Sequence, residues 1–292
     1  MKSLRNKVIL SGIVLLFAFI ATIGSTYAWF TVSSSTNIET MELNVTAADN
    51  LLLRVKTGEA EETLTFLQDA SNYKTYIEVA DLIAAGYLQD DVDTPWRLQP
   101  STVLQDATSR FSYLTDPNST TRTYAAATAN DYGGHYIHLE FWILSQSEDA
   151  KVIQLNDFAI DAIGIGNNTT EQEFVEQAVR LAVWLDDSDW GGAGATGEGT
   201  MYLFGNDSDY GYTYTSEMSG YDTVTSANNS APDQTGFTVN TTTSSTDLYT
   251  VNFNIPTLVN VAIYIEGWDA QATNDIILAA FQVSFGFKYK EV

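Results

Sequence analysis

Acidic and amide side chains gather at several places in this sequence, and they are the residues best suited to binding a ligand. The groups are Asp90, Asp91 and Asp93; Asp186, Asp187 and Asp189; Asn206, Asp207 and Asp209; and Glu266, Asp269, Asn274 and Asp275. Oxygen ligands in loops suit Ca²⁺, although no group has the EF-hand spacing and any of them could be a solvated acidic turn. The last group is the best candidate for a Ca²⁺ site, because patterned strands flank it.

The two histidines, His135 and His138, do not form a recognisable catalytic or zinc motif. If both lie in one strand, a spacing of three places them on opposite faces. The usual zinc protease needs two histidines one helical turn apart with an intervening Glu, and that pattern is missing. The sequence also lacks a P-loop, a dinucleotide fingerprint and a Gly-x-Ser-x-Gly motif. We therefore expect no enzyme, with a carboxylate-based glycosidase as a minor alternative.

The composition favours a folded, β-rich domain. The chain has 292 residues with a formal net charge of −24; 45% of the residues are hydrophobic and only 17% are charged. Such an acidic surface repels phosphate backbones and anionic lipid head groups, so nucleic acid and polybasic membrane attachment are poor expectations. Cysteine is absent, which excludes disulfides and thiolate chemistry.

Residues 1–28 have the pattern of an export signal. Basic residues start the chain, a mostly apolar run covers residues 8–23, and small residues lead to Ala28. A retained membrane anchor is the alternative, but the run is shorter than the ~20 residues that a spanning helix needs. We expect cleavage after Ala28, a mature chain from Trp29 to Val292, secretion, and no membrane attachment after cleavage.

Alternating apolar residues predict about eight or more strands in the mature chain. The pattern covers residues 41–45, 51–55, 139–143, 181–185, 249–255, 259–265 and 281–289. The last three follow one another, and we expect them to form a meander. The pattern predicts an all-β, jelly-roll-like sandwich in a single domain, residues 29–292.

Helical signals are few. Residues 76–85, followed by Gly86, predict a short helix with a glycine stop, and a second short helix is expected over residues 171–178. Residues 190–234 are dominated by Gly, Ser, Thr, Asn, Asp and Tyr, with one apolar run at 201–204. This composition predicts a long loop insertion on the sandwich.

The junction Thr26-Tyr27-Ala28-Trp29-Phe30-Thr31 resembles signal peptides that the SipW-type peptidase cleaves, which precede the TasA and camelysin family of secreted proteins. Residues 261–269 are similar to the closing strands of clostridial relatives. The resemblance implies a jelly roll, an extracellular location and, for TasA-like members, biofilm matrix fibres assembled by donation of an N-terminal strand. For camelysin-like members it implies a metallopeptidase, although no zinc motif is present.

Physical reasoning also favours a fibre. Residues 29–36 form an uncharged, β-prone segment that cleavage frees at the N-terminus. Trp29, Phe30 and Val32 can fill apolar pockets while the main chain pairs with a neighbour's sheet edge. Such head-to-tail contact makes a homopolymer, because it does not close. The segment could instead be a frayed end or the subunit's own first strand, and the protein an adhesive or ligand-binding surface module.

Overall fold

The protein is built almost entirely from β-strands. The computed structural model describes residues 36–38, 43–47, 50–58, 62–88, 96–103, 111–114, 124–130, 134–163, 175–185, 201–205, 238–239, 247–267 and 280–290. Helices in these ranges have at most six residues. Across the same ranges, no helix is long and apolar enough to cross a membrane. The predicted all-β sandwich is confirmed, while the jelly-roll order of its strands stays a prediction.

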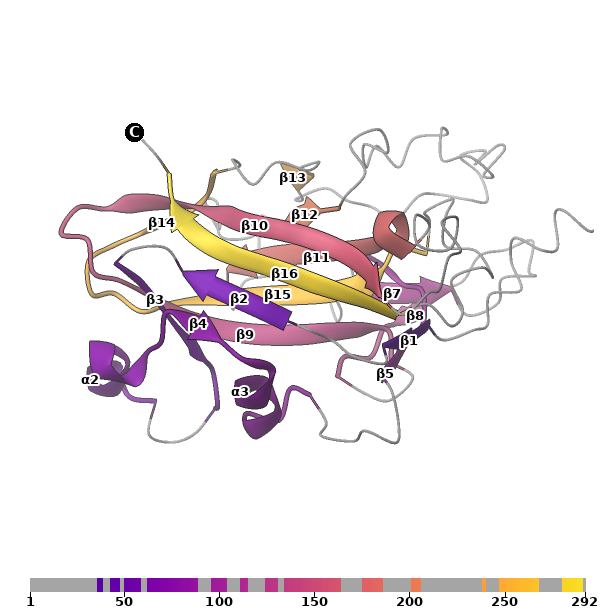
Figure 1. Ribbon diagram of the computed structural model, residues 1–292, viewed down its shortest axis with the longest axis horizontal. Coiled ribbons are helices and arrows are strands. Elements are labelled where there is room, and N and C mark those ends of the chain that lie inside the picture. Colours follow the sequence, from indigo (N-terminus) through magenta and orange to yellow (C-terminus); the bar gives the residue numbers. More distant parts are fainter. Residues whose placement is uncertain are drawn as a thin grey trace, which may run out of the picture.

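Two mixed sheets face each other (Figure 1). The five-stranded sheet has the order β14 (Asp247–Val251), β10 (Lys151–Ile163), β16 (Ala280–Tyr289), β2 (Leu43–Ala47) and β4 (Tyr76–Ile77). The six-stranded sheet has the order β13 (Thr238–Val239), β12 (Tyr202–Phe204), β11 (Val179–Leu185), β15 (Thr257–Ile265), β9 (Tyr136–Ser145) and β3 (Leu51–Val55). Neighbours are antiparallel except β2 with β16 and β12 with β13.

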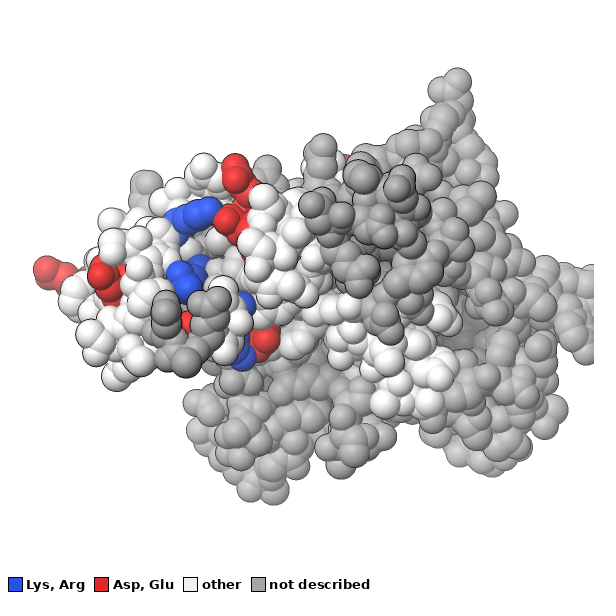
Figure 2. Space-filling model, turned by 90° about the horizontal axis from the view of Figure 1, so that it is seen from below, with Lys and Arg blue, Asp and Glu red and all other residues white. Residues whose placement is uncertain are grey.

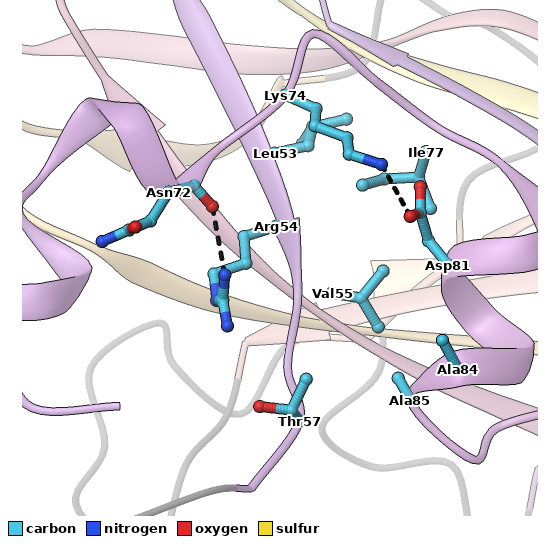
Figure 3. A pocket seen from close by; sticks show the side chains of 10 residues that line it. All are labelled: Leu53, Arg54, Val55, Thr57, Asn72, Lys74, Ile77, Asp81, Ala84 and Ala85. Carbon is cyan, nitrogen blue, oxygen red and sulfur yellow. Dashed lines mark hydrogen bonds and ion pairs between the residues drawn. The ribbon is translucent and has the colours of Figure 1, made fainter. Parts of the chain in front are cut away.

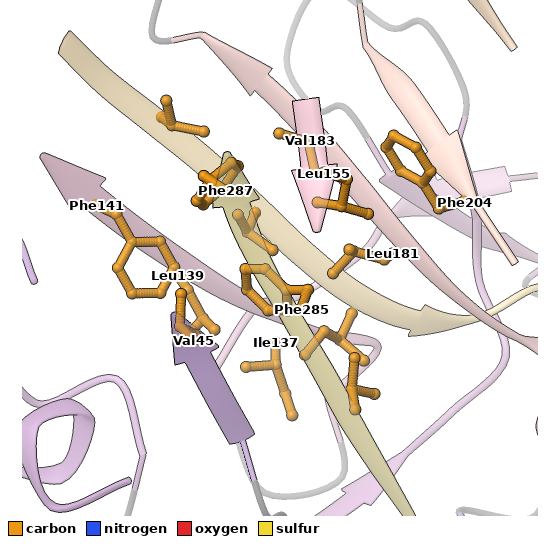
Figure 4. Close-up of a cluster of buried hydrophobic side chains, with 14 of the residues drawn as sticks. Val45, Ile137, Leu139, Phe141, Leu155, Leu181, Val183, Phe204, Phe285 and Phe287 are labelled. Atoms are coloured by element: carbon orange, nitrogen blue, oxygen red, sulfur yellow. The ribbon is translucent and has the colours of Figure 1, made fainter. Parts of the chain in front are cut away.

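Apolar side chains fill the space between the two sheets (Figure 4). The rings of Phe141 in β9 and Phe285 in β16 have centroids 6.3 Å apart, so the inner faces are in direct contact. In β9 the buried residues alternate with half-buried ones over most of the strand, as the sequence pattern predicts. Each fully buried Leu, Ile or Phe contributes about 1.5–3 kcal/mol, so this layer is the main source of stability.

Consecutive strands cross between the sheets and do not form the expected meander. β14 and β16 belong to the five-stranded sheet, whereas β15 between them belongs to the six-stranded sheet. The prediction was wrong because alternation reports which side chains are buried and not which strands pair. The strand expected over residues 249–255 also ends at Val251; Phe253 and Ile255 beyond it are 49% and 51% exposed.

A third, small sheet packs against the outer face of the six-stranded sheet. It consists of β6 (Thr102–Val103), β7 (Phe111–Leu114) and β8 (Tyr124–Ala126). Phe111 of this sheet contacts Tyr264 of β15 and Trp184 of β11, with ring centroids 5.1 and 6.2 Å away. β15 is therefore covered on both faces, which explains why eight of its nine residues are buried.

A helical segment closes the side of the sandwich where β3 and β4 are edge strands. It contains α2 (Leu64–Leu67), the 3-10 helix η1 (Ala70–Asn72) and α3 (Val79–Ala84), with β4 before α3. The helix predicted over residues 76–85 is confirmed for residues 79–84, but Tyr76 and Ile77 pair with β2 instead. Gly86 has a φ of +82°, the left-handed conformation expected of a glycine stop.

Part of the predicted loop insertion belongs to the sheet. Met201, Leu203 and Phe204 are fully buried, and β12 pairs with β11. The rest of residues 190–234 lies outside the described residues. The helix expected over residues 171–178 is described only for residues 175–178, where one helical turn leads directly into β11.

Candidate functional site

A pocket of about 200 Å³ opens between β3 and α3 (Figure 3). Its apolar wall consists of Leu53, Val55, Ile77, Ala84 and Ala85, and its polar wall consists of Arg54, Thr57, Asn72, Lys74 and Asp81. The pocket residues of β3 and those of the segment around Lys74 lie together because Leu53 and Lys74 exchange main-chain hydrogen bonds of 2.7 and 2.8 Å. The pocket therefore lies on the side of the sandwich where the edge strand β3 is joined to the segment that precedes β4.

The charged groups at the pocket are paired with one another. Lys74 Nζ lies 2.6 Å from Asp81 Oδ1, and Arg54 Nε lies 3.7 Å from Glu62 Oε1. Arg54 also donates to the main-chain oxygen of Asn72 at 3.1 Å, and its guanidinium lies 4.7 Å from the centre of the Phe66 ring. Seen from below, positive and negative side chains are interspersed over the described surface (Figure 2). The pocket consequently has no strong preference for an anion.

Glu62 is the hydrogen-bonding centre beside this pocket. Its carboxylate accepts from the main-chain N–H of Thr57 at 2.9 Å, the Thr57 hydroxyl at 3.1 Å and Trp142 Nε1 at 3.4 Å. Burial would raise the pKa of Glu62, but hydrogen bonds from Thr57, Trp142 and the Gly58 N–H outweigh it and lower the pKa. The lowered pKa favours the carboxylate form of Glu62, which accepts the hydrogen bonds that fix the end of β3.

Glu140 of β9 is a second carboxylate that accepts hydrogen bonds from neighbouring side chains. Lys56 Nζ lies 2.6 Å from Glu140 Oε1, and the Tyr87 hydroxyl donates to Oε2 at 3.0 Å. Burial and the neighbouring Glu140 raise the pKa of Tyr87. Tyr87 therefore stays protonated and holds Glu140 in place. Glu62 and Glu140 thus both serve as hydrogen-bond acceptors in this region.

Both histidines contact the outer layer of the molecule, so the expectation of opposite faces was wrong. The ring of His135 stacks on Tyr113 of β7 at 4.1 Å, and the ring of His138 stacks on Trp184 at 5.4 Å. The reason is that His135 precedes β9, so strict alternation does not extend to it. In the neutral ring, His135 Nδ1 accepts from the Thr128 N–H at 3.1 Å, and His138 Nε2 lies 2.8 Å from Asn260 Oδ1.

The predicted Ca²⁺ site is only partly described. Glu266 follows β15; its main-chain N–H donates to Ala178 at 2.9 Å, and the residue is 1% exposed. Asp269, Asn274 and Asp275 lie outside the described residues. In the described ranges, no three His, Asp or Glu side chains are grouped closely enough to hold a metal ion. The Ca²⁺ site therefore stays a prediction.

The predicted polymerisation residues Trp29, Phe30 and Val32 also lie outside the described residues. The description begins with β1 (Thr36–Ile38), which pairs with β5 (Trp96–Leu98). This pair is separate from both main sheets and lies at the right-hand end of the molecule in Figure 1. Thr36 thus belongs to a strand of its own subunit, so the donor segment that the sequence predicts over residues 29–36 can include at most residues 29–35.

Sequence reasoning missed the pocket. Arg54, Lys74 and Asp81 carry no motif, and they meet only because β3 and α3 are brought together. The one signal in the sequence was the alternation of apolar and other residues in β3, which predicts that Arg54 points away from the core.

No protein-family model, curated protein or solved structure matches this chain. The resemblance to the TasA and camelysin family rests on the leader, the junction after it and residues 261–269.

Proposed function

We propose that this protein is a secreted structural subunit of an extracellular filament, such as a biofilm matrix fibre. The signal peptide is removed after Ala28, and the N-terminal segment of each copy then joins the next copy as a donated strand. Its partner is therefore another copy of the same chain, outside the cell or at its surface.

The observation that carries this proposal is the position of β1, the first described strand, relative to the two main sheets. Among the described residues, the side chains of the hydrophobic core lie between Val45 and Phe287. β1 lies outside both main sheets, at one end of the sandwich. A segment that precedes β1 is therefore joined to the fold at one end of the described sandwich, which favours its contact with a neighbouring copy.

Charge sets the conditions for assembly. The full chain has a formal net charge of −24, and loss of the three basic residues of the leader makes the mature chain more negative still, so its copies repel one another. This repulsion weakens as salt shortens the Debye length to about 10 Å at 0.1 M. Mild acid and Ca²⁺ act in the same direction, since both neutralise carboxylates. We expect polymerisation to be favoured by each of these conditions.

Electron microscopy of the mature protein, residues 29–292, tests the proposal. The expected result is filaments of uniform width whose amount rises with salt. Sedimentation of the same samples gives the polymerised fraction. A protein that stays monomeric in 0.5 M salt, in millimolar Ca²⁺ and in mild acid would exclude the filament function.

The pocket between β3 and α3 favours a second candidate, an adhesive or ligand-binding surface module. It combines apolar residues with hydrogen-bonding groups, as small-molecule sites do. Screening monomers against glycans and matrix polymers tests this candidate. Binding that is lost when Ala84, which lines the pocket, is replaced by Met, but kept in an Ala80→Met control on the same helix, would support it.

A further inference from the structure

Three apolar side chains are exposed at one end of the sandwich, and we call them the end patch. Leu64, Phe253 and Ile255 are 63%, 49% and 51% exposed. Leu64 begins α2, and the other two lie in the connection from β14 to β15. In Figure 1 this end is on the left, opposite β1 and β5. Among the described large apolar residues, only Tyr76 of β4, outside the end patch, has comparable exposure at 50%.

Hydrogen bonds hold the two parts of the end patch together. Gln68 Nε2 donates to the main-chain oxygen of Asn254 at 3.3 Å. Gln68 lies one helical turn after Leu64, and its N–H donates to the Leu64 oxygen at 2.9 Å, so both side chains project from the same side of α2. Asn254 N–H donates to Ser145 at 2.9 Å. The patch is therefore a preformed surface.

The end patch and β1 are separated by the length of β15. This strand starts at Thr257, next to the patch, and ends at Ile265, whose oxygen accepts from the Ser101 N–H at 2.9 Å, just beyond β5. The first and last of the nine strand residues are eight rises apart, a distance of about 26 Å. The seven residues 29–35 reach about 25 Å at most. A subunit's own N-terminal segment would therefore have to run fully extended along the molecule to approach its own end patch.

We infer that the end patch is the contact surface for residues 29–35 of a second copy of this chain. The segment begins Trp29-Phe30-Thr31-Val32 and has no charged side chain, so it brings apolar side chains to the patch without adding negative charge to the contact between acidic subunits. The patch of one copy and the N-terminal segment of the next lie at opposite ends, so the contact repeats along a line and does not close. This inference rests on the proposed function and identifies the surface that receives the apolar side chains of the donated segment.

The test compares variants of exposed residues, which leave the core intact. The double variant Leu64→Ser, Ile255→Ser should raise the critical concentration for filaments at least about tenfold, because it removes most of the apolar contact. Tyr76→Ser is the matched control, with an equally exposed apolar side chain elsewhere, and should leave the critical concentration within about twofold of the wild type. Circular dichroism checks that both variants are folded.

The outcomes separate the two proposals. If the wild type forms filaments and the double variant assembles equally well, the end patch is not the receiving surface and the filament function stands. If the wild type forms no filaments, the filament function fails. The end patch is then tested by fluorescence anisotropy with a labelled peptide of residues 29–35: binding lost in the double variant but kept in Tyr76→Ser supports the inference, and equal or absent binding overturns it.

Discussion

Gly286 of β16 lies so close to Thr46 of β2 that a Cβ atom on the glycine would be 2.8 Å from the Thr46 main-chain oxygen. The two residues face each other in the parallel pair that joins β2 to the five-stranded sheet. The obstacle is backbone, which cannot rotate away as a side chain would. Glycine is thus required here for the two strands to meet.

Gly286→Ala should destabilise the protein by about 1–3 kcal/mol, the usual cost of an added methyl group in a tightly packed site. Urea unfolding followed by circular dichroism measures the change. Ser284→Ala on the same strand is the control and should change the free energy of unfolding by no more than about 0.5 kcal/mol. Equal stability of the two variants would mean that β2 and β16 are further apart than described.

Glu62→Gln should destabilise the protein by about 1–3 kcal/mol at neutral pH, because an amide replaces a carboxylate that accepts from Thr57 and Trp142. The lowered pKa of Glu62 gives stability that is present above the usual carboxyl range and is lost as pH falls through the folded-state pKa. The gap between wild type and variant should therefore narrow in acid. Glu148→Gln, in the exposed turn after β9, is the control and should show no such gap.

His135 should contribute to acid sensitivity. Burial lowers its pKa below the usual value of 6.5. The folded state therefore binds this proton less readily than the unfolded state, and stability from His135 is present above 6.5 and lost as pH falls below it. An NMR titration should place its midpoint below 6.5, and His135→Gln should flatten the fall in stability between pH 7 and 5. A midpoint above 6.5 would contradict the buried environment.

Many strands could be predicted from the alternation of apolar and polar residues. β10 is a strand that this pattern does not reveal. Ile153 and Leu155 are buried at odd positions, whereas Ile160 is buried at an even one. A bulge between Asn156 and Ala159 shifts the register, and Asp157 in it has a φ of +49°. Because an inserted residue reverses the inward face, β10, the longest of the described strands, has no continuous two-residue pattern in the sequence.

The candidate sites were less predictable because they depend on long-range contacts. The pocket needs Lys74 to pair with Leu53 across the gap between β3 and β4, and the end patch needs Gln68 to meet Asn254. Neither pairing leaves a local pattern. Phe253 and Ile255 were predicted as inward strand residues, since their spacing is that of a strand; the chain instead turns out of the sheet after Val251.

Millimolar Ca²⁺ should raise the melting temperature of the mature protein, and calorimetry should show heat of binding. The double variant Asp269→Asn, Asp275→Asn should remove both effects, since it takes away two carboxylate ligands. Glu148→Gln, Asp149→Asn is the matched control, with the same loss of charge in an exposed turn. If the control loses as much Ca²⁺ response as the test variant, the effect is general screening and the predicted site does not exist.

Deleting residues 29–35 should leave a folded monomer that cannot polymerise, because the described part of the core begins at Val45 and β1 keeps its pairing with β5. Burial of Trp29, Phe30 and Val32 contributes on the order of 1.5–3 kcal/mol each before association costs, enough to control assembly. Sedimentation and electron microscopy should show no filaments, while the melting temperature stays close to that of the wild type.

A replacement of the same residues by a Gly-Ser segment of equal length controls for the loss of chain length and should behave like the deletion. If the truncated protein still forms filaments, the segment is not the donor; if it unfolds, the segment belongs to the subunit's own sheet.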